Sequence, residues 1–127
     1  MKFSEYSYQR PDFDSYQKEY LTWVKKLDTT DVTEAIQAMD HLNKLRRQVD
    51  TAMNLASIRY SIDTKDAFYE AEDDWWNEYL PHFESLDFQF YQALLSAPTV
   101  AELREKYPET LFLFAESRVK LFDEKLI

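Results

Sequence analysis

The fold is decided by residues 31–61, DVTEAIQAMDHLNKLRRQVDTAMNLASIRYS. Apolar side chains recur here at three- and four-residue steps, which is the spacing of one helix face. These positions are Val32, Ile36, Met39, Leu42, Leu45, Val49, Met53 and Ala56. Asp31 and Glu34 resemble a capping box, and neither proline nor glycine interrupts the pattern. The spacing predicts one long helix over about 31–61, roughly 45 Å in length, which must pack against partner helices.

The flanking sequence predicts three or four further helices. The predicted spans are 12–27, a third helix from Asp63 or Thr64 to about 97, a short one at 99–107 and a last one from Pro108. Pro81 falls inside the third span and predicts a kink or a break near 79–81, because proline removes a backbone bond and clashes with the preceding turn. A capping box is also predicted at Thr99 and Glu102.

These elements predict an all-α fold in a single domain over residues 1–127. Because the connections are short, neighbouring helices are expected to be antiparallel. We therefore expect an antiparallel helical hairpin or bundle of four to five helices. The second and third helices would form a long hairpin, with the first and last helices packed across it.

The 127 residues include no glycine and no cysteine. Phosphate-binding loops and Rossmann turns need glycine where the backbone approaches a phosphate. Without cysteine there is no disulfide, no thiolate nucleophile and no cysteine zinc site. The composition therefore excludes nucleotide-phosphate loops and thiol chemistry.

The formal net charge is −9, and it is unevenly placed. Between Asp63 and Phe90 there are nine acidic residues and one basic residue, Lys65, so this segment carries −8. Such a balance disfavours nucleic acid and anionic membrane surfaces, whose binding needs Lys and Arg. No apolar run reaches the roughly 20 residues of a membrane span, and we expect a cytoplasmic location. The acidic run is typical of a solvated helix face.

No residue pattern points to catalysis or to a metal site. The two histidines, His41 and His82, are not part of a His-Glu-x-x-His motif, which places two imidazoles on one metal. Glu78 and His82 are four residues apart, whereas a di-iron bundle uses two Glu-x-x-His pairs. Close carboxylates such as Glu70 and Asp74 can act as acid and base only with a pocket and a raised pKa. We therefore assign no catalytic, cofactor-binding or metal-binding residue.

The aromatic residues of the acidic segment suggest a contact surface. At helical spacing, Phe68 and Trp75 are expected in the core. Tyr69 and Trp76 lie on the adjacent stripe and are the candidates for exposed contact, together with Asp73 and Asp74. One hypothesis is therefore a stand-alone acidic helical module that binds a basic protein partner.

A second hypothesis comes from a family resemblance. Residues 54–69, NLASIRYSIDTKDAFY, resemble the N-terminal region of the M3 zinc metallopeptidases, the oligoendopeptidase F and thimet-like family. Three other segments agree with that resemblance: YQRPD at 8–12, LNKLR at 42–46, and the acidic aromatic stretch 70–81 that ends in proline.

The resemblance implies an all-helical, clam-like enzyme in which two lobes enclose a channel for short peptides. This chain would be the first part of the N-terminal lobe and supply scaffold, and the 127-residue segment alone is not expected to be an enzyme. The family's zinc motif lies further along and maps to no residue here. The expected partners are the remainder of the peptidase chain and, for the intact enzyme, short peptides. Because 121–127 shows no helix stop signal, we expect a truncated lobe that self-associates through exposed positions such as Trp76 or Phe122.

Overall fold

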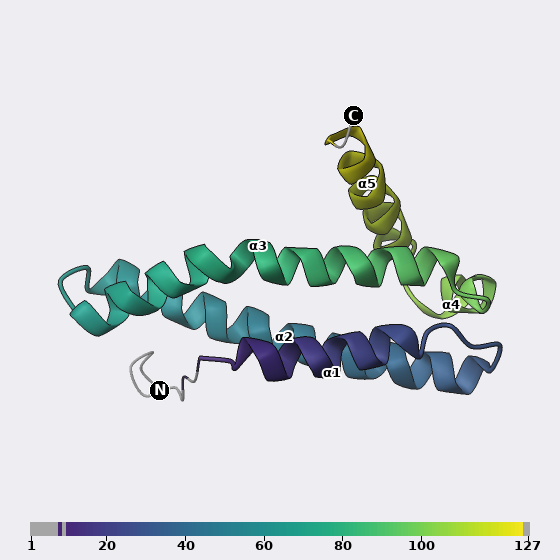
Figure 1. Cartoon of the computed structure of the whole chain (residues 1–127), viewed down its shortest axis with the longest axis horizontal. Coiled ribbons are helices and arrows are strands. Elements are labelled where there is room, and N and C mark those ends of the chain that lie inside the picture. Colours follow the sequence, from purple (N-terminus) through teal and green to yellow (C-terminus); the bar gives the residue numbers. More distant parts are fainter. Residues whose placement is uncertain (1–7, 9, 126–127) are drawn as a thin grey trace.

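The computed structural model describes residues 8 and 10–125, with side chains through residue 121, and the described chain is built of helices (Figure 1). The helices are α1 (Phe13–Lys25), α2 (Val32–Ile62), α3 (Ala67–Ser96), α4 (Val100–Lys106) and α5 (Glu109–Lys125). The all-α prediction is confirmed, and so is the long second helix, which has 31 residues.

Aspartates begin the first three helices. Asp31 accepts hydrogen bonds from the backbone N–H groups of Thr33 and Glu34, as its position predicted. The carboxylate of Glu34, however, accepts from the hydroxyl of Thr29 at 3.0 Å, and that hydroxyl in turn accepts from the N–H of Asp31 at 3.1 Å. Glu34 therefore completes the capping box indirectly, through the hydroxyl of Thr29, and not by a direct bond to the N–H of Asp31.

The predicted start of α3 and the predicted cap of α4 need correction. The N-cap of α3 is Asp66, not Asp63 or Thr64, and it accepts from the N–H groups of Phe68 and Tyr69. Asp63 instead ends α2 and holds the turn by accepting from the N–H of Lys65 at 3.2 Å. α4 begins at Val100 as expected, but Thr99 makes no side-chain cap, and its hydroxyl is buried with no partner in the described structure.

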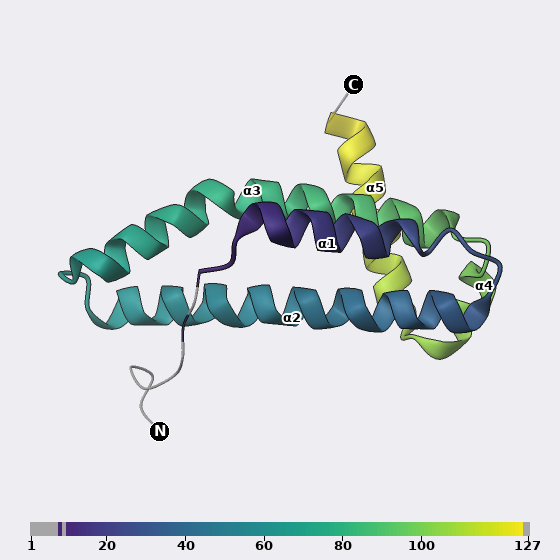
Figure 2. The same ribbon diagram turned by 60° about the horizontal axis from the view of Figure 1, so that its bottom comes forward.

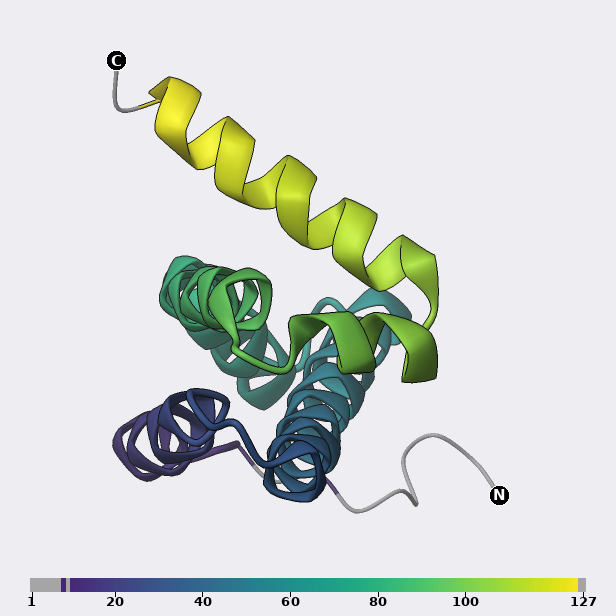
Figure 3. The same cartoon turned by 90° about the vertical axis from the view of Figure 1, so that its right-hand side faces the viewer.

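The helices α1, α2 and α3 lie side by side, and successive ones run in opposite directions (Figures 1 and 3). α5 crosses α3 steeply and extends away from the other helices (Figure 3). The main core lies where α1, α3, α4 and α5 meet the first half of α2. Its largest fully buried side chains are Tyr20, Leu27, Met39, Leu42, Leu86, Phe90, Leu94, Leu103 and Phe112. A second, smaller cluster lies nearer the turn between α2 and α3 and consists of Val49, Ala56, Trp76 and Phe83.

Pro81 lies within α3 without breaking it. Figure 2 shows that α3 is continuous but bends along its length. A bend is the usual result of a proline inside a helix, because the ring prevents one backbone hydrogen bond and displaces the preceding turn. The prediction was a kink or a break, and the helix bends without breaking (Figure 2).

Among the described residues, no helix combines the length and the apolar character needed to cross a membrane.

Candidate functional site

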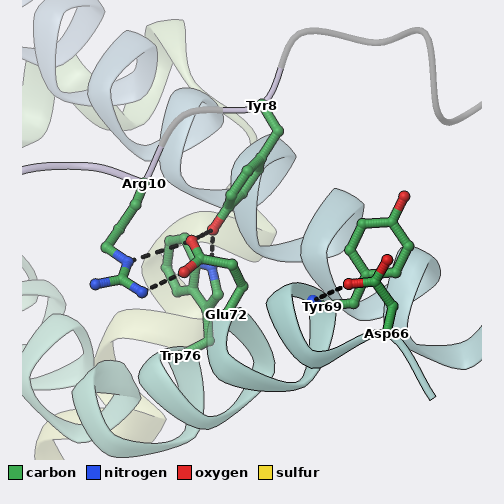
Figure 4. A network of polar contacts seen from close by, with 6 residues as sticks. All are labelled: Tyr8, Arg10, Asp66, Tyr69, Glu72 and Trp76. Atoms are coloured by element: carbon green, nitrogen blue, oxygen red, sulfur yellow. Dashed lines mark hydrogen bonds and ion pairs between the residues drawn. The ribbon is translucent and has the colours of Figure 1, made fainter. Parts of the chain in front are cut away.

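A buried carboxylate on α3, Glu72, forms the most connected polar site. Its side chain is only 6% exposed. The hydroxyl of Tyr8 donates to it at 2.7 Å, and the guanidinium of Arg10 donates to both carboxylate oxygens. The indole N–H of Trp76 donates to the same Tyr8 hydroxyl at 3.0 Å. Figure 4 shows Tyr8 and Arg10 reaching from the N-terminal segment towards one face of α3.

The electrostatics of this site follow from burial and from the two donors. Burial alone would raise the pKa of Glu72, but the hydrogen bonds from Arg10 and Tyr8 outweigh it, and the pKa is below its usual value. The pKa of Arg10 is raised, chiefly by the hydrogen bond to Glu72. Burial, followed by the hydrogen bond to Glu72, raises the pKa of Tyr8 to about 12. Glu72 is therefore an ionised acceptor in a structural bond network, not a proton donor.

A second polar cluster joins α1, α2 and α3 around Asp87. The hydroxyl of Tyr20 donates to Asp87 at 2.8 Å, and Nε of Arg46 lies 3.6 Å from the same carboxylate oxygen. Arg46 also donates to the hydroxyl of Tyr91 at 3.0 Å and lies over the ring of Phe90. Burial raises the pKa of Asp87, against the opposing effects of Arg46 and Tyr20.

Each histidine packs against at least one aromatic ring of α1. His41 of α2 stacks on Trp23 of α1 with ring centroids 3.9 Å apart. His82 of α3 lies beside Phe13 and Tyr79, at 5.8 and 5.5 Å. Within the described part of the chain, no group of three or more His, Asp or Glu side chains is arranged to hold a metal ion.

The structure corrects the predicted division of aromatic residues on α3. Trp76, predicted to be exposed, is 4% exposed, and Phe68, predicted to be in the core, is 58% exposed. Trp75 is half-buried, with its ring stacked on Tyr79 at 4.6 Å. Counting back from the buried Phe83 in steps of about 3.6 residues reaches 76 and 72 more closely than 75 and 68. The true buried stripe therefore runs through Trp76 and Glu72.

The other predicted contact residues are accessible to different degrees. Asp74 is exposed, whereas Tyr69 and Asp73 are half-buried. Asp73 accepts a hydrogen bond from the side chain of Asn77 at 3.3 Å. Of the four residues proposed for the contact surface, Trp76 is buried and the other three are at least partly exposed. Phe122, the second position predicted for self-association, lies outside the residues whose side chains are described.

The prediction that the acidic run is a solvated helix face is wrong for Glu72. The available signal was its position on the stripe that contains Trp76 and Phe83. A carboxylate on an apolar stripe needs a cationic or hydrogen-bonding partner, because an unpaired buried charge is costly. The partner could not be chosen from spacing, since Arg10 is 62 residues away in the sequence.

A groove of about 480 Å³ lies between α3 and α5. It is lined by apolar side chains, among them Leu80, Phe88 and Phe114, with Glu84 and Arg118 at polar positions. Phe114 and Leu121 of α5 both line this groove, and each is 47% exposed. Leu113 on the same helix is also exposed. α5 therefore presents an apolar face that the described helices leave uncovered.

Comparison with known proteins places this helical arrangement in a family. The sequence pattern of the Peptidase M3 N-terminal domain matches residues 3–122. The chain belongs to the M3 peptidase N-terminal domain family. The resemblance first seen at residues 54–69 is thereby confirmed.

Solved structures contain the same M3 N-terminal fold. A structure assigned to oligoendopeptidase F has a TM-score of 0.90 and 37% sequence identity, and one from Bacillus anthracis str. Ames, with the same assignment, has 0.89 and 34%. PZ peptidase A with inhibitor 2 has a TM-score of 0.89 and 32% identity. Each match covers 94% of this chain but only 21–22% of the other chain, so this M3 domain spans about a fifth of their length. No curated protein sequence matches the chain.

Proposed function

We propose that this M3 domain is the helical N-terminal scaffold of a cytoplasmic, zinc-dependent oligoendopeptidase that hydrolyses internal bonds of short peptides. The observation that carries the proposal is the match of 94% of this chain to only about a fifth of chains assigned to oligoendopeptidase F. The domain's role would be to form part of the lobe wall, with the chemistry supplied by other parts of the intact peptidase.

The uncovered face of α5 supports this role. Leu113, Phe114 and Leu121 are exposed, and the last two line the groove against α3. An apolar face of this kind marks a contact surface. Its occupant, under this proposal, is the remainder of the peptidase chain, and covering this face would fix α5 relative to the rest of the lobe.

Zinc belongs to the intact enzyme under this proposal. In the family that the chain resembles, a His-Glu-x-x-His helix with a downstream glutamate binds the metal, and zinc supplies an activated water for hydrolysis. The 127 residues contain no such motif. The described side chains supply position and shape, and no step of peptide hydrolysis is assigned to them.

A chimera tests the proposal directly. Residues 1–127 would replace the matching fifth of oligoendopeptidase F, and cleavage of an internally quenched peptide would be measured. We expect a folded, chelator-sensitive peptidase. In the same chimera Phe114→Glu should weaken activity by disturbing the covered face of α5, whereas Glu116→Gln on the same helix should not. A folded chimera without peptidase activity, or chelator-sensitive cleavage by residues 1–127 alone, would overturn the scaffold role.

An acidic interaction module is the second candidate function. Glu70, Asp74 and Glu78 are exposed at successive four-residue steps of α3, and Phe68 is exposed beside them. A basic partner would complement this face. Replacing Asp73 and Asp74 with lysine should weaken that binding, and more strongly at low salt, because screening is then smallest. Unchanged binding would identify the acidic residues as a solvated face only.

A further inference from the structure

In the described part of the chain, no helix covers the half of the α2–α3 hairpin that lies nearest its turn (Figure 2). α1 begins at Phe13, whose ring packs on Tyr79 and Phe83 at 5.6 and 5.1 Å. From there α1 runs away from the hairpin turn (Figure 2). Towards the turn, Tyr8 and Arg10 reach α3 from the N-terminal side of α1 (Figure 4).

Tyr8 connects both arms of the hairpin. Its hydroxyl is bonded to Glu72 and Trp76 of α3. Its ring faces Arg59 of α2, with the guanidinium carbon 5.7 Å from the ring centroid. Tyr8 also lines a surface groove along α2 that includes Ala52 and Leu55. A single side chain therefore contacts two helices at the end where these helices have the smaller core cluster.

Arg10 strengthens the same connection from the next described position. Its guanidinium forms the ion pair with Glu72 and lies 5.0 Å from the ring centroid of Trp75. Arg10 is partly exposed, whereas the Glu72 side chain is almost fully covered. If Tyr8 and Arg10 leave, Glu72 loses both its cation and the side chains that cover it, and the charge-assisted hydrogen bonds that stabilise the carboxylate are lost. The indole N–H of Trp76 loses its acceptor at the same time.

We propose that Tyr8 and Arg10 form a clasp that holds the tip of the α2–α3 hairpin closed, with Glu72 as its anchor. The tip is residues 52–78, and the body is the remaining described part of α1, α2 and α3. Release of the clasp and opening of the tip are coupled, because Tyr8 contacts both α2 and α3 and its departure removes a bridge between the two arms. The tip opens while the body stays folded, since the tip cluster is small and the main core lies at the other end. Local opening of this kind costs less free energy than global unfolding.

Opening would uncover a specific surface. Trp76 and the ring of Tyr8 would become accessible beside the acidic face of α3. The clasp thus controls whether the hairpin tip presents a closed acidic face or an open aromatic one. This device belongs to the chain itself and does not depend on peptidase activity, so it can fail while the scaffold proposal holds.

Native-state hydrogen exchange of the full 127-residue chain tests the clasp. Tyr8→Phe removes one hydroxyl and retains the ring, so the body is expected to fold. Glu72→Gln removes the charge at nearly constant volume. In both variants we expect tip amides to exchange at least about fivefold faster, as loss of hydrogen bonds worth roughly 1 kcal/mol implies. Amides of Phe13–Lys25 and of 86–94 should keep their rates.

The matched control is Glu116→Gln, which breaks the exposed Arg104–Glu116 pair between α4 and α5 and should leave tip exchange unchanged. Cleavage by trypsin gives a second readout, because Lys65 is exposed in the tip turn and Lys18 lies in α1. Tyr8→Phe should speed cleavage after Lys65 and not after Lys18. Equal acceleration in tip and body, or no acceleration of the tip in either variant, would overturn the clasp.

Discussion

Glu72 accepts a hydrogen bond of 2.7 Å from the hydroxyl of Tyr8, although 64 positions separate the two residues in the sequence. The bond joins the N-terminal segment to the first half of α3 and brings Arg10 onto the same carboxylate. It turns one member of a strongly acidic segment into a buried, paired group. It also ties Tyr8 and Arg10 to the α2–α3 hairpin.

The substitution Glu72→Gln should lower the free energy of unfolding by about 1–3 kcal/mol, because it removes charge-assisted hydrogen bonds from a buried acceptor. Chemical denaturation followed by circular dichroism measures the change. The exposed pair of Arg104 and Glu116 provides the control, and Glu116→Gln should cost less than about 1 kcal/mol. Equal losses in the two variants would contradict a special role for Glu72.

The contribution of Glu72 should depend on pH in a defined direction. Its pKa in the folded chain is below the usual 4.5, so the folded state favours the ionised form and the stabilisation is fully present above that value. It is lost as the pH falls below 4.5 and passes through the folded pKa. Denaturation of the wild-type chain and of Glu72→Gln over this range should show their stability difference shrinking. A difference that grows on acidification would contradict the assignment.

Two phenylalanines of α3 provide a test of which stripe is buried. Phe90 is fully buried and Phe68 is largely exposed. Phe90→Ala should destabilise the chain by about 3–5 kcal/mol through lost apolar burial and a cavity. Phe68→Ala should change stability by about 0.5 kcal/mol or less, as surface substitutions usually do. Thermal and denaturant unfolding of both variants would reveal comparable losses if the buried stripe were assigned wrongly.

Self-association of the 127-residue chain is expected to use the apolar face of α5. Trp76 was predicted to mediate self-association, but it is buried and cannot do so in the folded chain. Phe114, by contrast, is exposed beside an uncovered groove. Light scattering over a concentration series should show association that Phe114→Glu weakens. The exposed Ile62 lies at the opposite end of the hairpin, and Ile62→Glu adds the same charge there as a control. If both variants weaken association equally, added charge rather than the α5 face is responsible.

Helix positions were predictable because their signals are local. The apolar spacing from Val32 to Ala56 sets the long helix, and Asp31 caps it through its own neighbours. The start of α3 was misplaced by two or three residues. Asp63, Thr64 and Asp66 lie together in the turn and each is a residue type that can cap a helix, but Asp66 is the one that does. Thr99 shows the same limit, since a cap pattern in the sequence did not produce a cap bond.

The candidate site was much less predictable. Trp75 and Trp76 are adjacent, so a shift of one residue exchanges the exposed ring for the buried one. A sequence pattern also treats every carboxylate as a group that prefers water. Glu72 departs from that rule only because Arg10 and Tyr8 meet it in space.

By itself, the sequence determined the all-α class, the long second helix and the hairpin, because apolar periodicity and short turns act between near neighbours. The resemblance to M3 peptidases was also readable from a continuous stretch, residues 54–69. Only the tertiary structure decided that Glu72 is paired with Arg10 and Tyr8 and that α5 crosses α3 with an uncovered apolar face. Both depend on contacts between residues far apart in the chain. Such contacts form when side chains are brought together by packing, and no local spacing specifies them.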